Sequence, residues 1–338
     1  MSSSMANLRV SLLVVHHHQE KKLLACLESI QKQNHTNLEI ILVNTDSNPL
    51  AIAADFLVQV HNIPNQGYAH ALNHASTFAQ GDYFLLLNAD TELFADTISK
   101  LLEIIQDYPQ AILNPKTLTV NGALDSLGNQ MHYTGITSRL TSFEVPLDAR
   151  VCAIPVLSGA AIFLAREVFI ALHGFDPDYF MYFEDTDFSL RAKLLGFELL
   201  GCLNCPIVHD SVFSLNPEKF YLLERNRVLL LFKIYQTSTL IKMLPALSLT
   251  ALITFGFAFI KGFDYLKAWF RVLVWLMTQP TWLLEKRNAF QAQRLKSDQV
   301  FLVSSTIILP FEALTKQPLA AVLTNLTTPF YQLFRWFL

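Results

Sequence analysis

The sequence is short of charge. Asp, Glu, Lys and Arg make up 16% of its 338 residues, whereas hydrophobic residues make up 52% and the mean hydropathy is +0.32. This composition is more apolar than that of an ordinary soluble protein, so we expect part of the surface to meet a membrane. The length allows one large α/β domain with an appendage, because single cores stop growing near ~250–300 residues.

Cysteines and familiar catalytic motifs are also scarce. The four cysteines are scattered, which argues against a disulfide framework. Cys202 and Cys205 form one CxxC pair with no second pair, so we interpret them as core residues rather than as a zinc or redox site. There is no Walker loop, no GxGxxG after the first predicted strand and no serine-centred nucleophile elbow. These absences argue against a P-loop nucleotidase, a Rossmann-type dehydrogenase and a serine hydrolase.

Secretory signals and an even spread of charge are missing too. Residues 1–9 lack the charged start and long apolar core of a signal, so we expect the N-terminal part to stay in the cytosol. Residues 1–214 contain 11 Lys and Arg against 22 Asp and Glu, and residues 215–338 contain 14 against 6. We predict an acidic domain over 1–214 that faces a metal ion and a basic, apolar region over 215–338 that faces anionic lipid. The basic region is too apolar to favour nucleic acid.

Strands and helices alternate in the predicted N-terminal domain. Residues 10–15 and 38–43 are continuous apolar runs typical of buried strands, and the helical spacing of residues 23–33 completes a βαβ unit. The further predicted elements are a strand over 56–61, a helix over 69–79, a strand over 83–87, a helix over 95–106, short strands within 114–155, a helix over 187–195 and a strand over 197–203. This order predicts an α/β fold with a mostly parallel central sheet, whose ligands bind at the carboxyl ends of the strands.

The C-terminal region is predicted to be helical and apolar. Residues 243–260 carry no charge and have about the minimum length for a membrane span, with Lys242 and Lys261 at the ends. Later apolar stretches are interrupted by charges, which favours helices lying in the membrane plane. One span or hairpin and a soluble helical cap are the alternatives.

Two groups of acids are candidates for chemistry. Asn88 and Asp90 follow a predicted strand, where side chains two apart share a face and offer the oxygen ligands that Mg²⁺ and Mn²⁺ favour. Asp90 is equally suited to cap a following helix. Glu184, Asp185 and Asp187 stand at a predicted helix start, where acids ordinarily serve the helix. The aromatic residues before them, however, would desolvate a carboxylate and raise its proton affinity, as a general base requires.

Histidines, amides and one glycine complete the candidates. His209 follows a strand and would complete a metal site if it reached Asp90, although a lone histidine is more often structural. Residues 16–18 are three histidines, which we place at the edge of a nucleotide pocket rather than around a metal, because consecutive strand residues do not share a face. Gly67 permits close backbone approach, and Asn65 and Asn73 suit hydroxyl and phosphate recognition; a simple turn is the alternative.

In this order, the blocks resemble glycosyltransferase family 2, notably its rhamnosyltransferase-like branch. The matching blocks are residues 10–33, 65–73, 81–90, 157–160, 174–176, 180–191 and His209, with residues 287–298 similar to the tail of that branch. The resemblance covers about residues 8–235. It implies a GT-A fold, a nucleoside-diphosphate-sugar donor, a divalent cation such as Mg²⁺ or Mn²⁺, and inversion at the anomeric carbon.

The resemblance also implies roles for individual residues. Asp90 with Asn88 would hold the metal and the diphosphate, His209 would complete the metal shell, and Asp185 would be the base with Glu184 as its supporting neighbour. The other assigned residues are Asn44, Asp46, Asn65, Gly67 and Asn73 on the donor side and Ser158, Gly159 and Asp187 on the acceptor side. The family usually has Asp at the position of Asn44, and Asp46 is the nearest substitute.

The predicted function is therefore an inverting, metal-dependent transferase at the cytoplasmic face of the cell membrane. It would add a sugar, with rhamnose as one candidate, to a lipid-linked or cell-surface glycan. Two other functions stay open. One is a non-catalytic scaffold or sugar-binding protein of the same fold, which Asn44 would favour. The other is a membrane-bound nucleotidyltransferase, which would release diphosphate instead of a nucleoside diphosphate.

Overall fold

The chain folds into two compact units. The computed structural model describes residues 7–50, 58–143, 146, 148–211, 214–313 and 318–338. The first unit comprises residues 1–129, 139–192 and 197–212, and the second comprises residues 130–138, 193–196 and 213–338. The second unit thus includes two short segments, Gln130–Ser138 and Lys193–Gly196, that come from within the N-terminal part of the sequence.

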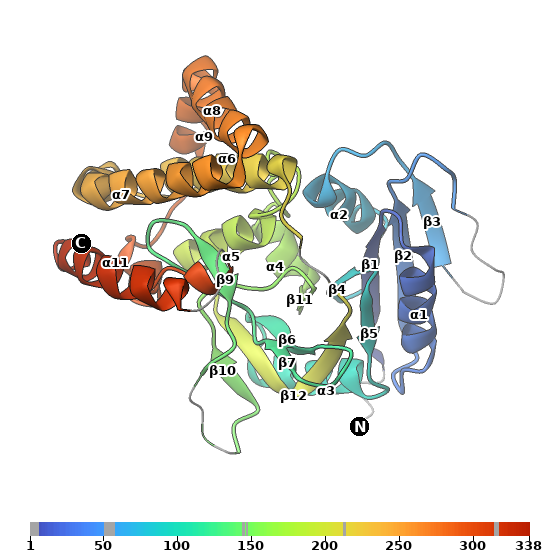
Figure 1. Cartoon of the computed structure of the whole chain (residues 1–338). Coiled ribbons are helices and arrows are strands. Elements are labelled where there is room, and N and C mark those ends of the chain that lie inside the picture. Colours follow the sequence, from blue (N-terminus) through green and yellow to red (C-terminus); the bar gives the residue numbers. More distant parts are fainter. Residues whose placement is uncertain (1–6, 51–57, 144–145, 147, 212–213, 314–317) are drawn as a thin grey trace. The chain divides into compact units, whose positions relative to one another are not determined.

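Ten strands of the first unit form one sheet among the described residues (Figure 1). They are β1 (Val10–His16), β2 (Leu38–Asn44), β3 (Val58–Asn62), β4 (Tyr83–Asn88), β5 (Thr91–Leu93), β6 (Ile112–Leu118), β7 (Leu124–Ser126), β10 (Val151–Ala153), β11 (Ala161–Ala165) and β12 (Leu199–His209). The path is β10-β12-β6-β11-β4-β1-β2-β3, with β5 beside β12 and β7 beside β6. Strands β8 (Asn129–Met131) and β9 (Thr137–Arg139) pair separately.

The predicted α/β fold with a mostly parallel central sheet is confirmed. Strands β4, β1, β2 and β3 run parallel to one another, as do β6 and β12, whereas β11 is antiparallel between β4 and β6. Because β1, β2 and β4 are parallel neighbours, the residues that follow them meet at one edge. His16 is in register with Asn44, and Val15 with Asn88.

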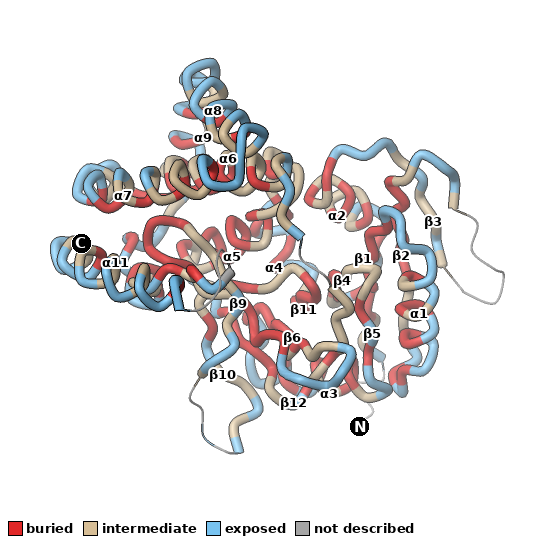
Figure 2. Tube along the Cα trace, in the orientation of Figure 1, coloured by how far each residue is buried: buried red, intermediate tan, exposed pale blue. Residues whose placement is uncertain are grey.

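Helices cover the first unit's sheet, and its central strands are buried (Figure 2). They are α1 (Glu20–Gln31), α2 (Tyr68–Ser76), α3 (Thr97–Asp107), α4 (Arg166–Ala171) and α5 (Glu184–Leu195). Leu12 and Val14 of β1 pack in one apolar cluster with residues of α1 and α3. Helix α2 packs against β1 and β2, and α4 against β11. The continuous apolar runs of β1 and β4 therefore follow from burial on both faces of the sheet.

Several boundaries differ from the predictions, and one of these differences excludes a helix-capping role for Asp90. Residues Thr91–Leu93 form β5 rather than a helical turn, and α3 begins only at Thr97. The interpretation of Asp90 as a helix cap is therefore wrong. Helix α5 begins at Glu184 instead of residue 187, and β12 continues to His209 instead of ending at residue 203. Residues 56 and 57 of the predicted third strand lie outside the described residues.

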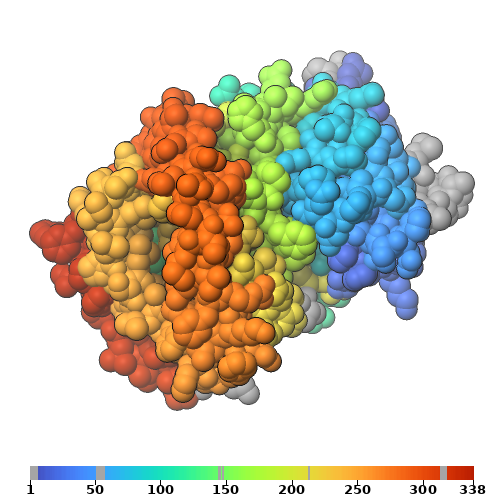
Figure 3. All heavy atoms as spheres, turned by 90° about the horizontal axis from the view of Figure 1, so that it is seen from above, coloured from blue at the N-terminus to red at the C-terminus, as the bar shows by residue number. Residues whose placement is uncertain are grey.

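The second unit is helical. Its helices are α6 (Pro217–Ile234), α7 (Thr237–Lys261), α8 (Phe263–Thr278), α9 (Pro280–Gln291), α10 (Gln299–Leu302), η2 (Phe311–Ala313) and α11 (Leu319–Arg335). Within the described residues, α7 is the one helix long and apolar enough to cross a membrane. Its buried side chains form a single stripe of Met243, Ala246, Thr250, Thr254 and Ala258. Figure 3 shows α8, in orange, lying along the outside of this unit.

Candidate active site

A short antiparallel pairing brings two predicted metal ligands together. Asp90 lies between β4 and β5, and β5 pairs with the end of β12 so that Thr91 is opposite His209. The Asp210 N–H donates to the Asp90 carbonyl at 2.9 Å. As a result, Nε2 of His209 lies 3.4 Å from Oδ1 of Asp90. A carboxylate oxygen and an imidazole nitrogen at this separation fit two ligands that are each about 2.1 Å from one divalent cation.

On its other side, the His209 ring faces a second acid, Asp125 of β7. The distance from Nδ1 of His209 to Oδ2 of Asp125 is 3.6 Å. Asp125 is buried, pairs with Arg139 and accepts from the Thr117 hydroxyl at 3.3 Å. Burial alone would lower the pKa of His209, but hydrogen bonds and charges from Asp125 and Asp90 outweigh it and raise that pKa to about 9.

Asp185 lies in the first turn of α5, where several donors hold its carboxylate. Its Oδ2 accepts from the Gly159 N–H at 3.1 Å and from the Asn129 amide at 3.3 Å, and its Oδ1 accepts from the Thr186 N–H at 2.6 Å. Burial raises the pKa of Asp185, and these hydrogen bonds oppose part of the rise. The residue keeps some exposure to solvent, as a base that meets an acceptor requires.

Glu184 is more deeply buried than Asp185. Its Oε2 has no hydrogen-bond partner among the residues that the structure describes. Burial and the neighbouring Asp185 charge both raise the pKa of Glu184. The turn before it is strained, because Tyr182 and Phe183 both have φ 69, a conformation that bulky residues rarely adopt.

Tyr68, the first residue of α2, connects the two groups of acids. Burial raises the pKa of its phenol well above the ordinary value, and the charges of Glu184, Asp90 and Asp185 raise it further. Its hydroxyl donates to the Gly159 carbonyl at 3.4 Å. The metal-ligand candidate Asp90 and the base candidate Asp185 are therefore both within electrostatic range of the same phenol.

Gly67 lies at a close contact between two loops. The Tyr68 N–H donates to the Phe180 carbonyl at 2.9 Å, and Gly67 itself has φ 98. A Cβ atom at position 67 would lie 2.1 Å from the Phe180 oxygen. The Gly67 N–H donates to Oδ1 of Asn65 at 3.0 Å, which fixes the turn. The close backbone approach predicted for this glycine is present, and its partner is the loop that leads to α5.

Two amide side chains that were assigned to the donor side form hydrogen bonds within the protein. Asn44 is buried and donates to the Asn48 carbonyl at 2.9 Å and to Oδ1 of Asn62 at 2.8 Å. Asn73 donates to the Phe175 carbonyl at 2.7 Å and accepts from the Phe175 N–H at 2.9 Å. Both side chains hold loops in this structure, and their role in donor binding stays a prediction.

The remaining assigned residues divide between the end of β4 and the interior of the first unit. The Asn88 N–H, at the end of β4, donates to the Ala160 carbonyl at 3.1 Å, which brings Ser158 and Gly159 beside this strand end. Asp187 is fully buried and pairs with Arg191 at 2.7 Å. Its assignment to the acceptor side is therefore corrected, because its carboxylate serves an internal ion pair.

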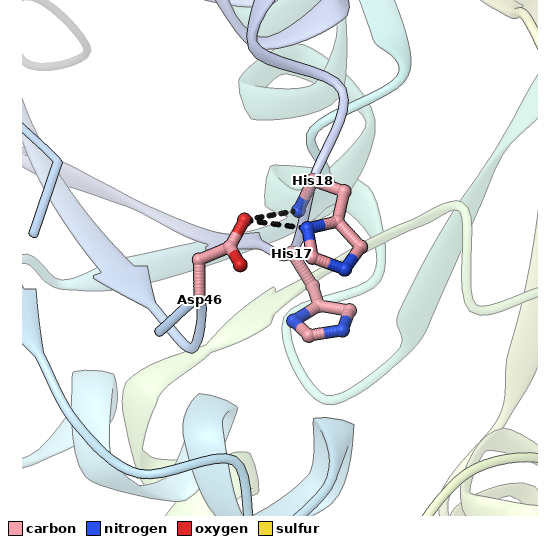
Figure 4. A group of neighbouring side chains, drawn as sticks. All are labelled: His17, His18 and Asp46. Carbon is pink, nitrogen blue, oxygen red and sulfur yellow. Dashed lines mark hydrogen bonds and ion pairs between the residues drawn. The ribbon is translucent and has the colours of Figure 1, made fainter. Parts of the chain in front are cut away.

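Asp46 groups with two of the three consecutive histidines (Figure 4). Its Oδ2 accepts from the His18 N–H at 3.0 Å and lies 2.7 Å from Nδ1 of His18. The rings of His17 and His18 are 4.2 Å apart between centroids. The premise that consecutive histidines point apart is wrong here, because β1 ends at His16 and His18 has φ 59.

Residues 11–172 match the family model described as glycosyl transferase family 2. This match supports glycosyltransferase family 2. An uncharacterized glycosyltransferase from Haemophilus influenzae is 24% identical over 189 residues, which cover 54% of this chain and 61% of that protein. The chain thus spans less than two thirds of the length of this relative.

Two solved structures share the fold at low sequence identity. The crystal structure of GalNAc-T7 with UDP, GalNAc and Mn²⁺ matches with a TM-score of 0.59 and 17% identity, over 68% of this chain and 48% of that chain. Residues 1–349 of Staphylococcus aureus TarS in complex with UDP-GlcNAc match with a TM-score of 0.53 and 15% identity, over 78% and 79%. The predicted GT-A fold is confirmed by this likeness.

Two residues of the site, Asp125 and Tyr68, were not among the candidates predicted from the sequence. Asp125 lies in the segment 114–155, for which only short strands were predicted, and it reaches His209 through the pairing of β7 with β6. No local spacing signals that contact. Tyr68 directly follows Gly67 in the block of residues 65–73 that resembles family 2, and that block was the available signal.

Replacing Gly67 with alanine should destabilise the first unit more than the same change at Gly122. Both glycines have positive φ, 98 and 79, which costs alanine roughly 1–2 kcal/mol. At Gly67 the new Cβ also meets the Phe180 carbonyl, whereas at Gly122 no described atom lies within 4 Å. Denaturant unfolding of the two variants checks this, and equal losses would contradict the close contact.

Replacing Asp125 with asparagine should lower the pKa of His209 from about 9 toward its ordinary value. In the wild type, the raised pKa of His209 adds to the free energy of unfolding. This contribution is fully present below about pH 6.5 and is lost as the pH rises through the pKa that His209 has in the folded state. The variant should lose part of this dependence. NMR titration of ¹³C-labelled histidine in metal-free protein measures it, with the surface change Asp107→Asn as control. An unchanged pKa would mean that Asp90 alone sets it.

Proposed function

We propose that this chain is an inverting, metal-dependent glycosyltransferase that moves a sugar from a nucleoside-diphosphate donor to a lipid-linked or cell-surface glycan. The observation that carries the proposal is the convergence of Asp90 and His209, with Asp185 near the same Tyr68 phenol. The family 2 match over residues 11–172 supports the reaction class. The bound UDP and Mn²⁺ named for GalNAc-T7 agree with the donor and cofactor class.

In the proposed reaction, Asp185 takes the proton of an acceptor hydroxyl as its oxygen attacks the anomeric carbon. The bond from that carbon to the diphosphate breaks, and the nucleoside diphosphate leaves. One direct displacement inverts the anomeric configuration, and no covalent enzyme intermediate is needed. When bound to Asp90, His209 and Asn88, an Mg²⁺ or Mn²⁺ ion would neutralise the leaving diphosphate.

Our proposals for the donor and the acceptor rest on the residues of the same site and on the resemblance noted above. Asp46 lies in the loop after β2, and Asn65 and Gly67 lie in the loop after β3. They are our donor-side residues, while Ser158 and Gly159 are our acceptor-side residues. The blocks similar to the rhamnosyltransferase-like branch make a deoxyhexose, rhamnose, the first donor sugar to test. A screen of nucleotide sugars with product analysis by mass spectrometry identifies the sugar and the leaving group, and release of diphosphate would instead support a nucleotidyltransferase.

A non-catalytic scaffold of the same fold is the second candidate. The observation in its favour is Asn44, which stands where family 2 usually has Asp and whose amide bonds to Asn48 and Asn62. Calorimetry that showed no metal-dependent binding of any nucleotide sugar would support it.

The second unit supports attachment to an anionic membrane. Phe259, Ile260 and Phe263 at the turn between α7 and α8 are 68%, 84% and 79% exposed. Lys261 lies between Ile260 and Phe263 in the sequence, and residues 215–338 carry 14 Lys and Arg against 6 acids. Exposed apolar side chains beside cations suit the interface of anionic lipids. The cysteines of the chain are free, as in a reducing compartment, so we place the site at the cytoplasmic face.

Replacing Asp185 with asparagine should lower sugar transfer by about 10²–10⁴-fold, because the amide keeps the shape and loses basicity. Binding of the nucleotide sugar with metal should persist. The matched control is Glu167→Gln, which removes an exposed acid from the first turn of α4. Initial rates and calorimetry on both variants test the assignment, which is wrong if Asp185→Asn transfers at the wild-type rate.

Replacing Phe259, Ile260 and Phe263 with serine should weaken cosedimentation with phosphatidylglycerol vesicles at least tenfold. A fully buried large apolar side chain contributes about 1.5–3 kcal/mol, so even partial insertion of three gives this factor. Ile170→Ser, at a 58% exposed position of the first unit, should change nothing. Salt should weaken wild-type binding. The attachment would be refuted if the full chain stayed in solution without detergent and did not cosediment with the vesicles.

A further inference from the structure

Three side chains outside the Asp90 pair gather at the carboxyl ends of β1 and β2. One possible ligand atom from each of His17, His18 and Asp46 lies within 4.8 Å of the others. Both histidines are exposed and Asp46 is partly so, which leaves the group open to an ion from solvent. Figure 4 shows His18 turned to Asp46 with His17 beside it.

The three side chains come together because the backbone turns out of the strand after His16. His18 and Gln19 have φ 59 and 67, a left-handed turn that residues other than glycine rarely adopt. The turn lays the His18 ring beside that of His17 and aims the His18 N–H at Asp46. Parallel pairing of β1 with β2 supplies Asp46 from the neighbouring strand end.

Hydrogen bonds orient both imidazoles for a metal. The Thr45 hydroxyl donates to the His16 carbonyl at 3.1 Å, so it accepts from Nδ1 of His17, 3.3 Å away. In His18, Nδ1 donates to Asp46. His17 then keeps its lone pair on Nε2. At His18, a cation would replace the Nδ1 proton, so that Nδ1 and Oδ2 of Asp46, 2.7 Å apart, would become neighbouring ligands.

We propose that His17, His18 and Asp46 form a binding site for a divalent transition-metal ion of the zinc class. Two borderline imidazoles with one hard carboxylate suit Zn²⁺ and Co²⁺, and three protein ligands leave a coordination position for water. The residues differ from Asp90, Asn88 and His209, whose site is richer in oxygen. Asp46 is also one of our donor-side residues, so metal binding is measured without nucleotide sugar and does not depend on the proposed transfer reaction.

The test is metal titration of the tag-free, metal-stripped full chain in detergent. Zn²⁺ binding is followed by competition with a chromophoric chelator, and Co²⁺ binding by its visible absorption, which reports ligand type and geometry. We expect one equivalent that survives in Asp90→Asn. In Asp46→Asn and His18→Gln, the affinity should fall at least tenfold.

The matched control is His173→Gln. His173 is also an exposed histidine with positive φ, 56, so the change reproduces the backbone effect without touching the group. Melting temperatures verify that each variant folds. Three results would overturn the proposal: no bound Zn²⁺ in the wild type, unchanged affinity in Asp46→Asn and His18→Gln, or loss of the site in Asp90→Asn. Failure of sugar transfer would leave these readouts unaffected.

Discussion

The antiparallel pairing of β5 with the end of β12 is the constraint on which the candidate site depends. Without it, Asp90 would be one more acid after a strand, and His209 would be a lone histidine. With Thr91 opposite His209, the carboxylate and the imidazole meet at 3.4 Å, and Asp125 reaches the other ring nitrogen. In this mostly parallel sheet, one short antiparallel strand, β5, therefore places His209 at the carboxyl ends of the parallel strands.

Strained backbone gives the acids their positions. Phe180 contacts Gly67 and Tyr68 through its carbonyl, and Tyr182 and Phe183 then turn through two left-handed conformations before α5 begins at Glu184. Such conformations persist only where surrounding contacts over-determine them. Here the contact to Gly67 and the burial of Phe183 provide that support. The loop that carries the acids is therefore coupled to the loop that precedes α2.

The sequence predicted what depends on local pattern. Apolar runs indicated the central strands, and the motifs around Asp90 and Asp185 indicated acids that the structure places near one phenol. The predictions from the sequence failed where contacts between distant residues determine the position of a side chain. Nothing near Asp125 signals His209, and an amide such as Asn73 looks the same whether it faces a ligand or the Phe175 backbone. For His17 and His18, the rule of alternating faces was applied to the two residues beyond the end of β1.

Adjacent carboxyls at the start of α5 are chemically distinct, and this favours Asp185 as the base. Burial raises the pKa of both Glu184 and Asp185. The Gly159 and Thr186 N–H groups stabilise a negative charge on Asp185, while Oε2 of Glu184 has no partner among the described residues. When two neighbouring carboxyl groups carry one negative charge between them, the group that accepts hydrogen bonds from N–H donors is the one that is ionised. Glu184, whose pKa is raised to about 8, then holds the proton at neutral pH, and its neutral side chain adds no second negative charge beside Asp185, the proposed base.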